Sequence, residues 1–153
     1  MPYRENVDLE QQIEGFNSAY EKGDEAWFKY FDANATIYTI GATEPFIGRA
    51  AYEDNFRNLL REHRQVDELK RNVQVMGNTA VVMQLQHVTQ SQVMTVLRQS
   101  TIWKQEDGTW KIIHMHCAST GNPSPVGTLR DPQAIKVLTG RIATVSAQAG
   151  VAQ

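Results

Sequence analysis

The chain has 153 residues, 41% of them hydrophobic, and a formal net charge of −2. This length suits one folded domain, and the small net charge gives no electrostatic basis for binding nucleic acid or an anionic membrane. Cys117 is the only cysteine, which excludes an intramolecular disulfide. No apolar run approaches the roughly 20 residues that cross a bilayer, and the first residues lack an apolar signal core. We therefore expect a cytoplasmic protein without nucleic-acid or membrane partners.

Three helices are predicted in the first half of the chain. Leu9, Ile13, Phe16 and Tyr20 fall on one stripe of a first helix that ends near Gly23. Asp24 is a suitable N-cap for a second, shorter helix with several aromatic residues. The third helix spans about 49–62. Short β-rich pieces at 35–40 and 45–47 separate the last two helices.

The next part of the chain is predicted to consist of long strands. Strand-like segments occur at 68–76, 79–90, 95–104 and 109–118, and the last two are joined by Asp107-Gly108, a strong hairpin signal. Helices followed by such a meander predict an α+β fold in which a curved, mixed sheet wraps over the helices as a cone.

A final segment follows this cone-shaped domain. Residues 1–122 form the predicted domain, and residues 123–153 form a proline-containing connector and a C-terminal helix that opens at Asp131-Pro132. That helix could pack on the domain or on a partner subunit.

Strand alternation predicts which side chains face the helices. In 79–90 the odd positions, which end with His87, are more apolar than the even ones, so we expect them to point inward. A two-residue turn at Asp107-Gly108 pairs Thr101 with His114 and Gln99 with His116. A three-residue loop would instead pair Ser100 with His114 and Arg98 with His116. The first register places these residues on the inner face: Gln99, Thr101, Trp103, Ile112, His114 and His116.

The predicted outer face also carries apolar residues, namely Val82, Val88, Val96, Ile102, Ile113 and Met115. An outer sheet face is normally polar, so this one should be covered. The cover could be the C-terminal helix or the sheet of a second subunit. We favour a homodimer.

Two sequence features resemble the association domain of calcium/calmodulin-dependent protein kinase II. One is Phe56-Arg57-Asn58-Leu59-Leu60 after the Gly23-Asp24 helix end. The other is the segment 102–116, with a tryptophan strand, an Asp-Gly turn, Trp-Lys and a final His-x-His. The resemblance covers roughly 9–122 and lies within the nuclear-transport-factor-2-like or SnoaL-like superfamily. It implies a cone with a deep cavity and a dimer, or a larger ring, built through the sheets.

The resemblance also bears on the ligand. Arginines in that family's pocket suit carboxylates, but the corresponding positions here are His87, Thr101 and Cys117. A neutral or differently charged ligand therefore fits better. His114 and His116 match the family.

Several roles remain open for the candidate site residues. His87, His114 and His116 could be structural, could bind a ligand, or could act in acid–base catalysis, with His87 and His116 as the catalytic candidates. A metal site is the least favoured interpretation, and we expect neither metal nor cofactor. Tyr38 and Tyr52, with Trp27 and Phe56, could line the cavity mouth or be plain core. Asp32 could be a base but also fits a turn, and Cys117 is expected to be a buried filler.

Two functions follow from these interpretations. The first is a small-molecule-binding, self-associating domain. The second is a cofactor-independent isomerase, cyclase or dehydratase that acts on a small organic substrate in the cone pocket.

Overall fold

The computed structural model describes residues 2–119 and 124–125. In chain order its elements are helix α1 (Pro2–Lys22), 3-10 helix η1 (Glu25–Tyr30), strand β1 (Phe31–Tyr38), strand β2 (Phe46–Ile47), helix α2 (Arg49–Leu60) and strands β3 (Gln65–Met76), β4 (Thr79–Gln90), β5 (Val93–Glu106), β6 (Thr109–Ser119) and β7 (Ser124–Pro125). The predicted order of helices and strands is confirmed. The C-terminal helix predicted from Asp131 lies outside the described residues.

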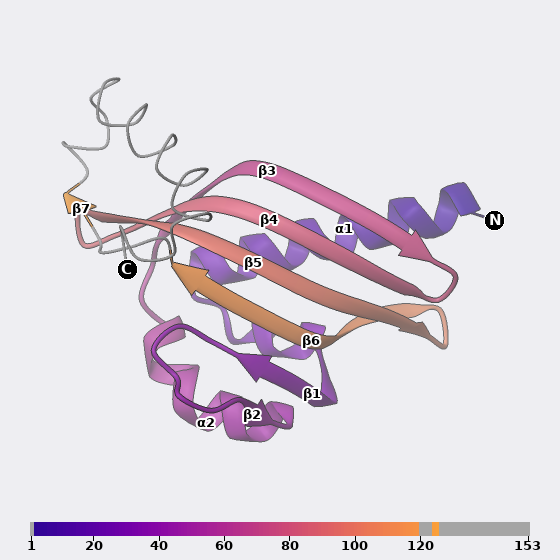
Figure 1. Cartoon of the computed structure of the whole chain (residues 1–153), viewed down its shortest axis with the longest axis horizontal. Helices are drawn as coiled ribbons and strands as arrows, with labels where there is room; N and C mark the ends of the chain where they lie inside the picture. The colour runs from indigo at the N-terminus through magenta and orange to yellow at the C-terminus, as the bar shows by residue number, and fades with distance from the viewer. Residues whose placement is uncertain (1, 120–123, 126–153) are drawn as a thin grey trace.

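The strands form one curved, open sheet in the order β2-β1-β6-β5-β4-β3, and β7 pairs with β5. β1 runs parallel to β6, while the other pairs are antiparallel. Figure 1 shows α1 crossing behind the long strands, with α2 beside β1 and β2. The predicted α+β fold, a mixed sheet curved over N-terminal helices, is confirmed. We call the face toward the helices the inner face and the opposite face the outer face.

The apolar stripe of α1 packs into the core. Leu9 and Ile13 are completely buried, and Phe16 is 2% exposed. The Phe16 ring meets Trp27 of η1 in a stack and Trp103 of β5 edge-on, with centroids 5.2 and 5.8 Å apart. The helical spacing of these apolar residues thus produces the contact between the helices and the inner face of the sheet.

A buried arginine joins the C-terminal ends of α1 and α2. The guanidinium of Arg64 donates hydrogen bonds to the carbonyl oxygens of Tyr20 (2.6 Å) and Leu59 (2.8 Å). It also lies 4.4 Å from the centroid of the Tyr20 ring. The last carbonyls of a helix lack partners within the helix and carry partial negative charge, so a cation is favourable there. Arg64 therefore fixes the spacing of the two helices.

A β-bulge in β6 changes the direction of the side chains that follow it. Trp103 pairs with Ile112, but Ile102 pairs with His114, which leaves Ile113 as an extra residue. A bulge of this kind shifts the alternation by one position. Ile112 and Met115 consequently both face inward, with exposures of 0% and 1%.

Gly23, between α1 and η1, offers a test of this packing. Its φ is +69°, and a Cβ there would lie 2.5 Å from the carbonyl oxygen of Leu60. Gly77 has a similar φ of +62° but no atom within 4 Å of such a Cβ. Gly77→Ala should cost about 1–2 kcal/mol of unfolding free energy from φ alone. Gly23→Ala should cost about 1–3 kcal/mol more because the chain must also move aside. Urea unfolding of both variants measures the difference, and equal losses would contradict the packing of Gly23 against α2.

Candidate functional site

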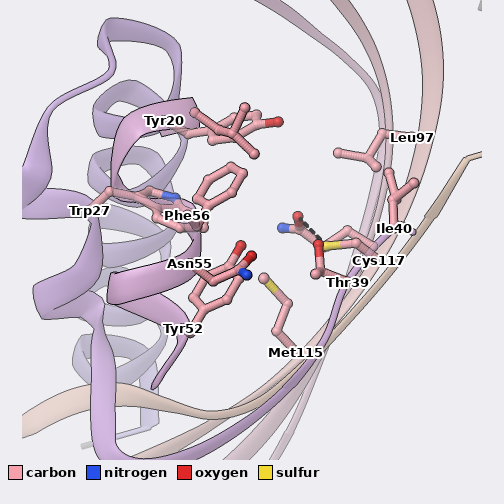
Figure 2. A pocket seen from close by; sticks show the side chains of 12 residues that line it. Tyr20, Trp27, Thr39, Ile40, Tyr52, Asn55, Phe56, Leu97, Met115 and Cys117 are labelled. Atoms are coloured by element: carbon pink, nitrogen blue, oxygen red, sulfur yellow. Dashed lines mark hydrogen bonds between the residues drawn. The ribbon is translucent and has the colours of Figure 1, made fainter. Parts of the chain in front are cut away.

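A cavity of about 160 Å³ lies between the helices and the inner face of the sheet (Figure 2). Its lining comes from α1, η1, the segment directly after β1, α2, β5 and β6: Tyr20, Trp27, Thr39, Ile40, Tyr52, Asn55, Phe56, Leu59, Leu97, Gln99, Met115 and Cys117. Ile40 and Leu59 are 48% and 56% exposed, whereas Trp27, Tyr52 and Met115 are almost fully buried. The cavity therefore opens between the end of β1 and the last turns of α2.

Aromatic rings form the helix side of the cavity. Tyr52 and Phe56 are four residues apart on α2, so they lie on the same helix face. Their rings stack with centroids 5.3 Å apart and an interplanar angle of 8°. Trp27 of η1 packs against Phe56 at 5.5 Å. In Figure 2 these rings stand opposite Leu97, Met115 and Cys117 of the sheet. This wall suits a flat or apolar molecule.

Neutral polar groups are interspersed among these apolar groups. They are the hydroxyls of Tyr20, Tyr52 and Thr39, the amides of Asn55 and Gln99, and the thiol of Cys117. Burial raises the pKa of both tyrosines, and it raises the pKa of Cys117 to about 12. All three groups therefore remain protonated at neutral pH and act as hydrogen-bond donors or acceptors, not as charges.

No lining residue within the described part of the chain is an Asp, Glu, His, Lys or Arg. An isolated ion entering such a cavity would lose hydration without gaining a counter-charge. A general base or acid that titrates near neutrality is also missing from this lining. The described cavity is thus suited to holding a neutral molecule and poorly equipped for proton transfer.

The indole N–H of Trp27 is buried without a hydrogen-bond partner among the described residues. Trp110, which does not line the cavity, has the same property. The unpaired indole is therefore not specific to the cavity.

A second hollow lies on the surface of η1 and α2 and has a volume of about 480 Å³. Its residues are mostly charged, and its arginines and glutamates are paired with one another. Arg57 binds Glu25 at 3.0 Å, and Arg49 binds Glu53 at 3.2 Å. We interpret this hollow as a solvated ion-pair network of modest energetic weight.

The predicted inward direction of His87 is wrong. The buried positions of β4 are the even ones, Ala80, Val82, Gln84, Gln86 and Val88. His87 lies on the outer face, where it pairs with Val96 on one side and Asp67 on the other. Burial lowers the pKa of His87, and the Asp67 carboxylate acts in the opposite direction. The prediction failed because it assigned two glutamines to solvent, whereas Gln84 and Gln86 are 4% and 2% exposed.

The inward direction predicted for His114 and His116 is also wrong. The Asp107-Gly108 turn has the predicted two-residue register, but the bulge at Ile113 moves His114 opposite Ile102 and His116 opposite Ser100. Both imidazoles therefore lie on the outer face. His114 Nδ1 is 2.7 Å from the hydroxyl oxygen of Thr36 on β1.

Tyr38 belongs with His116 and not with the cavity. It pairs with His116 across β1 and β6, and the two rings meet edge-on with centroids 5.6 Å apart. Its hydroxyl donates to the carbonyl oxygen of Thr43. The bulge thus accounts for the outward position of His114 and His116, and Tyr38 shares their face through its pairing with His116.

The other predicted site residues do face inward. Gln99 and Tyr52 line the cavity. Thr101 and Trp103 are 1% exposed, and Trp103 Nε1 donates to Thr101 Oγ1 at 2.8 Å, but neither residue lines the cavity. Asp32 accepts a hydrogen bond from the backbone N–H of Asn34, as its turn interpretation predicts.

The corrected alternation also changes the predicted outer surface. Val82, Val88 and Met115 were expected outside, but they belong to the buried core. In the central strands the apolar outer residues are Val81, Met83 and Leu85, together with Val96 and Ile102, which were predicted there. An apolar outer face is still present, but only part of it was predicted.

Sequence reasoning missed several cavity residues. Tyr20 was assigned to the apolar stripe of the first helix and Met115 to the wrong face, and no role in the cavity was predicted for Asn55, Leu59 or Leu97. For Met115 the missing information was the bulge. For the others the missing information was the spacing between helix and sheet, which Arg64 helps to fix.

Two classes of site or segment were not found in the described part of the chain. None of its His, Cys, Asp and Glu residues form a group of three or more that could hold a metal ion. None of its helices is both long and apolar enough to cross a membrane.

Solved structures with this fold carry varied descriptions. An NTF2-like protein of unknown function from Pseudomonas putida matches with a TM-score of 0.71 and 16% identity, over 80% of this chain and 90% of that one. An NTF2-like protein from Streptomyces avermitilis, provisionally assigned as a dehydratase, has a TM-score of 0.69 and 18% identity, over 78% and 98%. A structure from Xanthomonas campestris, provisionally assigned as a calcium/calmodulin-dependent protein kinase II association domain, has a TM-score of 0.65 and 17% identity, over 72% and 84%.

At these identities the similarity establishes the fold alone. No curated protein matches the chain. The SnoaL-like domain family matches residues 9–120, which include every residue that lines the cavity. The chain therefore belongs to the SnoaL-like family, within the nuclear-transport-factor-2-like fold.

Proposed function

We propose that the protein is a self-associating domain whose inner cavity binds a small, neutral, largely apolar molecule. The observation that carries this proposal is the cavity lining, in which aromatic rings and uncharged hydrogen-bonding groups occur together without an ionic group in the described residues. Binding sites for small molecules commonly combine an apolar lining with a few placed polar groups.

The size of the cavity limits the ligand. A cavity of about 160 Å³ is comparable to engineered protein cavities of roughly 150 Å³ that accept benzene. The stacked Tyr52 and Phe56 favour a single aromatic or similarly flat ring. The exposed side chains of Ile40 and Leu59 at the opening would allow a somewhat longer ligand to extend toward solvent.

The outer face supports self-association. Met83 is 50% exposed, and Val81, Leu85 and Ile102 lie near it on β4 and β5. Apolar residues gathered on an exposed face favour a protein contact, and a two-fold pair of identical faces is the most frequent arrangement. A relative with this fold carries the description of an association domain. We propose a homodimer that can assemble further into a larger ring.

A second candidate is a cofactor-independent isomerase, cyclase or dehydratase. The provisional dehydratase assignment of the Streptomyces avermitilis protein favours it. The proposed catalytic residues, His87 and His116, lie on the outer face, so they could not act on a molecule in the cavity. Chemistry in the cavity would have to use Tyr52 or Tyr20, whose raised pKa values make them weak acids. We therefore favour binding over catalysis.

Filling the cavity tests the binding proposal. Leu97 is 5% exposed and lines the cavity, so Leu97→Trp should occupy the space. Phenol should bind the natural protein saturably, and Leu97→Trp should weaken binding by about tenfold or more because the ring has no room. An NMR titration of the backbone amides measures the affinity for phenol and identifies the residues whose chemical shifts change. Leu69→Trp, on the exposed side of β3, is the matched control. Unchanged affinity in Leu97→Trp, or no binding to the natural protein, would contradict the proposal.

Charging the outer face tests self-association. Met83→Glu should raise the dimer dissociation constant at least about tenfold, because a carboxylate would lose its hydration in the contact. Ile47→Glu is the control, since Ile47 is 71% exposed on β2 at the edge of the sheet. Light scattering over a dilution series gives the dimer dissociation constants of the natural protein and of the two variants. A monomeric natural protein, or equal effects of the two substitutions, would rule out the outer face as the contact.

A further inference from the structure

Side-chain amides connect the cavity to an ion pair at the β3 edge. Cys117 Sγ donates to Gln99 Oε1 at 3.3 Å, and Gln99 Nε2 donates to Gln84 Oε1 at 3.2 Å. Gln84 Nε2 in turn donates to the carboxylate of Glu68 and to Asn17 Oδ1. Gln84 and Gln99 are cross-strand partners on the inner face, and both are less than 8% exposed. Of these hydrogen-bonded side chains, only Gln99 and Cys117 line the cavity.

The Glu68 carboxylate determines the orientation of the Gln84 and Gln99 side-chain amides. An ionised carboxylate only accepts hydrogen bonds, so Gln84 must turn its NH₂ group toward Glu68 and its oxygen toward Gln99. Gln99 must then turn its own NH₂ group toward Gln84. Its carbonyl oxygen is left facing Cys117 and the cavity. Reversing either amide would place two acceptors against each other inside the protein, which is unfavourable at low dielectric.

Glu68 is itself held in place. A second bulge, at Leu69, puts Glu68 opposite Gln86 and Arg71 opposite Gln84, so both charged residues are on the inner face. Arg71 Nε lies 2.9 Å from Glu68 Oε1. Arg71 also binds Glu10 and Glu14 of α1 at 2.8 and 2.7 Å. The carboxylate thus has a fixed position and a counter-charge.

We infer that Glu68 is a positioning residue for ligand selection: through Gln84 it orients the Gln99 amide so that the cavity presents a carbonyl oxygen. The ligand class is then a small neutral ring that carries an O–H or N–H group directed at the sheet. This inference rests on the proposed binding function. Gln99 Oε1 has two lone pairs, so it can accept from a ligand as well as from Cys117. Cys117 donates because its thiol stays protonated.

A matched pair of probes tests this selectivity. Phenol and fluorobenzene have nearly the same shape, but only phenol donates a hydrogen bond. Phenol should bind the natural protein roughly 5- to 10-fold more tightly, the value of one net hydrogen bond. Gln84→Met should lower this ratio while leaving the cavity lining intact, because the Gln99 amide is then free to turn its carbonyl oxygen away from the phenol hydroxyl. Glu68→Leu, at a side chain that is 25% exposed, cuts the same chain of hydrogen bonds from its other end. Gln86→Met, a buried neighbour on the same strand face, should keep the natural ratio.

A ligand-free measurement separates this inference from the proposed function. Cys117 is the only thiol, so its S–H stretching band reports whether it donates to a carbonyl oxygen. The band should move to higher frequency in Gln84→Met, Glu68→Leu and Gln99→Met, but not in Gln86→Met. An unmoved band in the first two variants, or equal binding of the two probes to the natural protein, would overturn the inference. Failure of both probes to bind would overturn the proposed function, and the band would still decide the direction of the amide.

Discussion

The single extra residue in β6 determines what each face of the sheet can do. Because Ile113 has no partner on β5, the chain reaches Met115 and Cys117 with their side chains inside, and it reaches His114 and His116 with theirs outside. Regular alternation from Ile112 would have produced the reverse arrangement. The cavity would then have contained two titratable imidazoles, and the outer face would have contained a methionine and a cysteine. The bulge therefore keeps the imidazoles of His114 and His116 out of the cavity.

This separation of chemistry matches the two proposed roles. The cavity on the inner face offers aromatic rings, amides and hydroxyls, which suit a neutral ligand held by shape and a few hydrogen bonds. The outer face offers apolar side chains bordered by His114, His116 and Tyr38, which suits contact with another protein surface. The two faces share β4, β5 and β6, so a change in how these strands curve would affect both. Arg64 adds a fixed distance on the helix side by binding the ends of α1 and α2.

Much of the fold could be predicted from the sequence because local signals agreed with the tertiary structure. The apolar stripe of α1, the cap at Asp24 and the turn at Asp107-Gly108 each occur as predicted. The faces of β4 could not be predicted, since Gln84 and Gln86 appear solvent-facing unless the Glu68 and Asn17 partners of Gln84 are known. The bulge at Ile113 has no glycine or other local signal. Gln99 was assigned to the inner face correctly, because the alternation of β5 is regular. For Tyr52 the cavity mouth and the core both remained open, and the structure places it in the cavity lining.

The central claim is that the protein encloses a neutral cavity behind a sheet whose histidines face outward. A crystal structure of the protein grown with phenol tests it most directly. The account predicts a ring between Tyr52 and Leu97, with its hydroxyl near Gln99, and His114 and His116 on the opposite face of the sheet. A cavity that stays empty at saturating phenol, or imidazoles that point into it, would contradict the account.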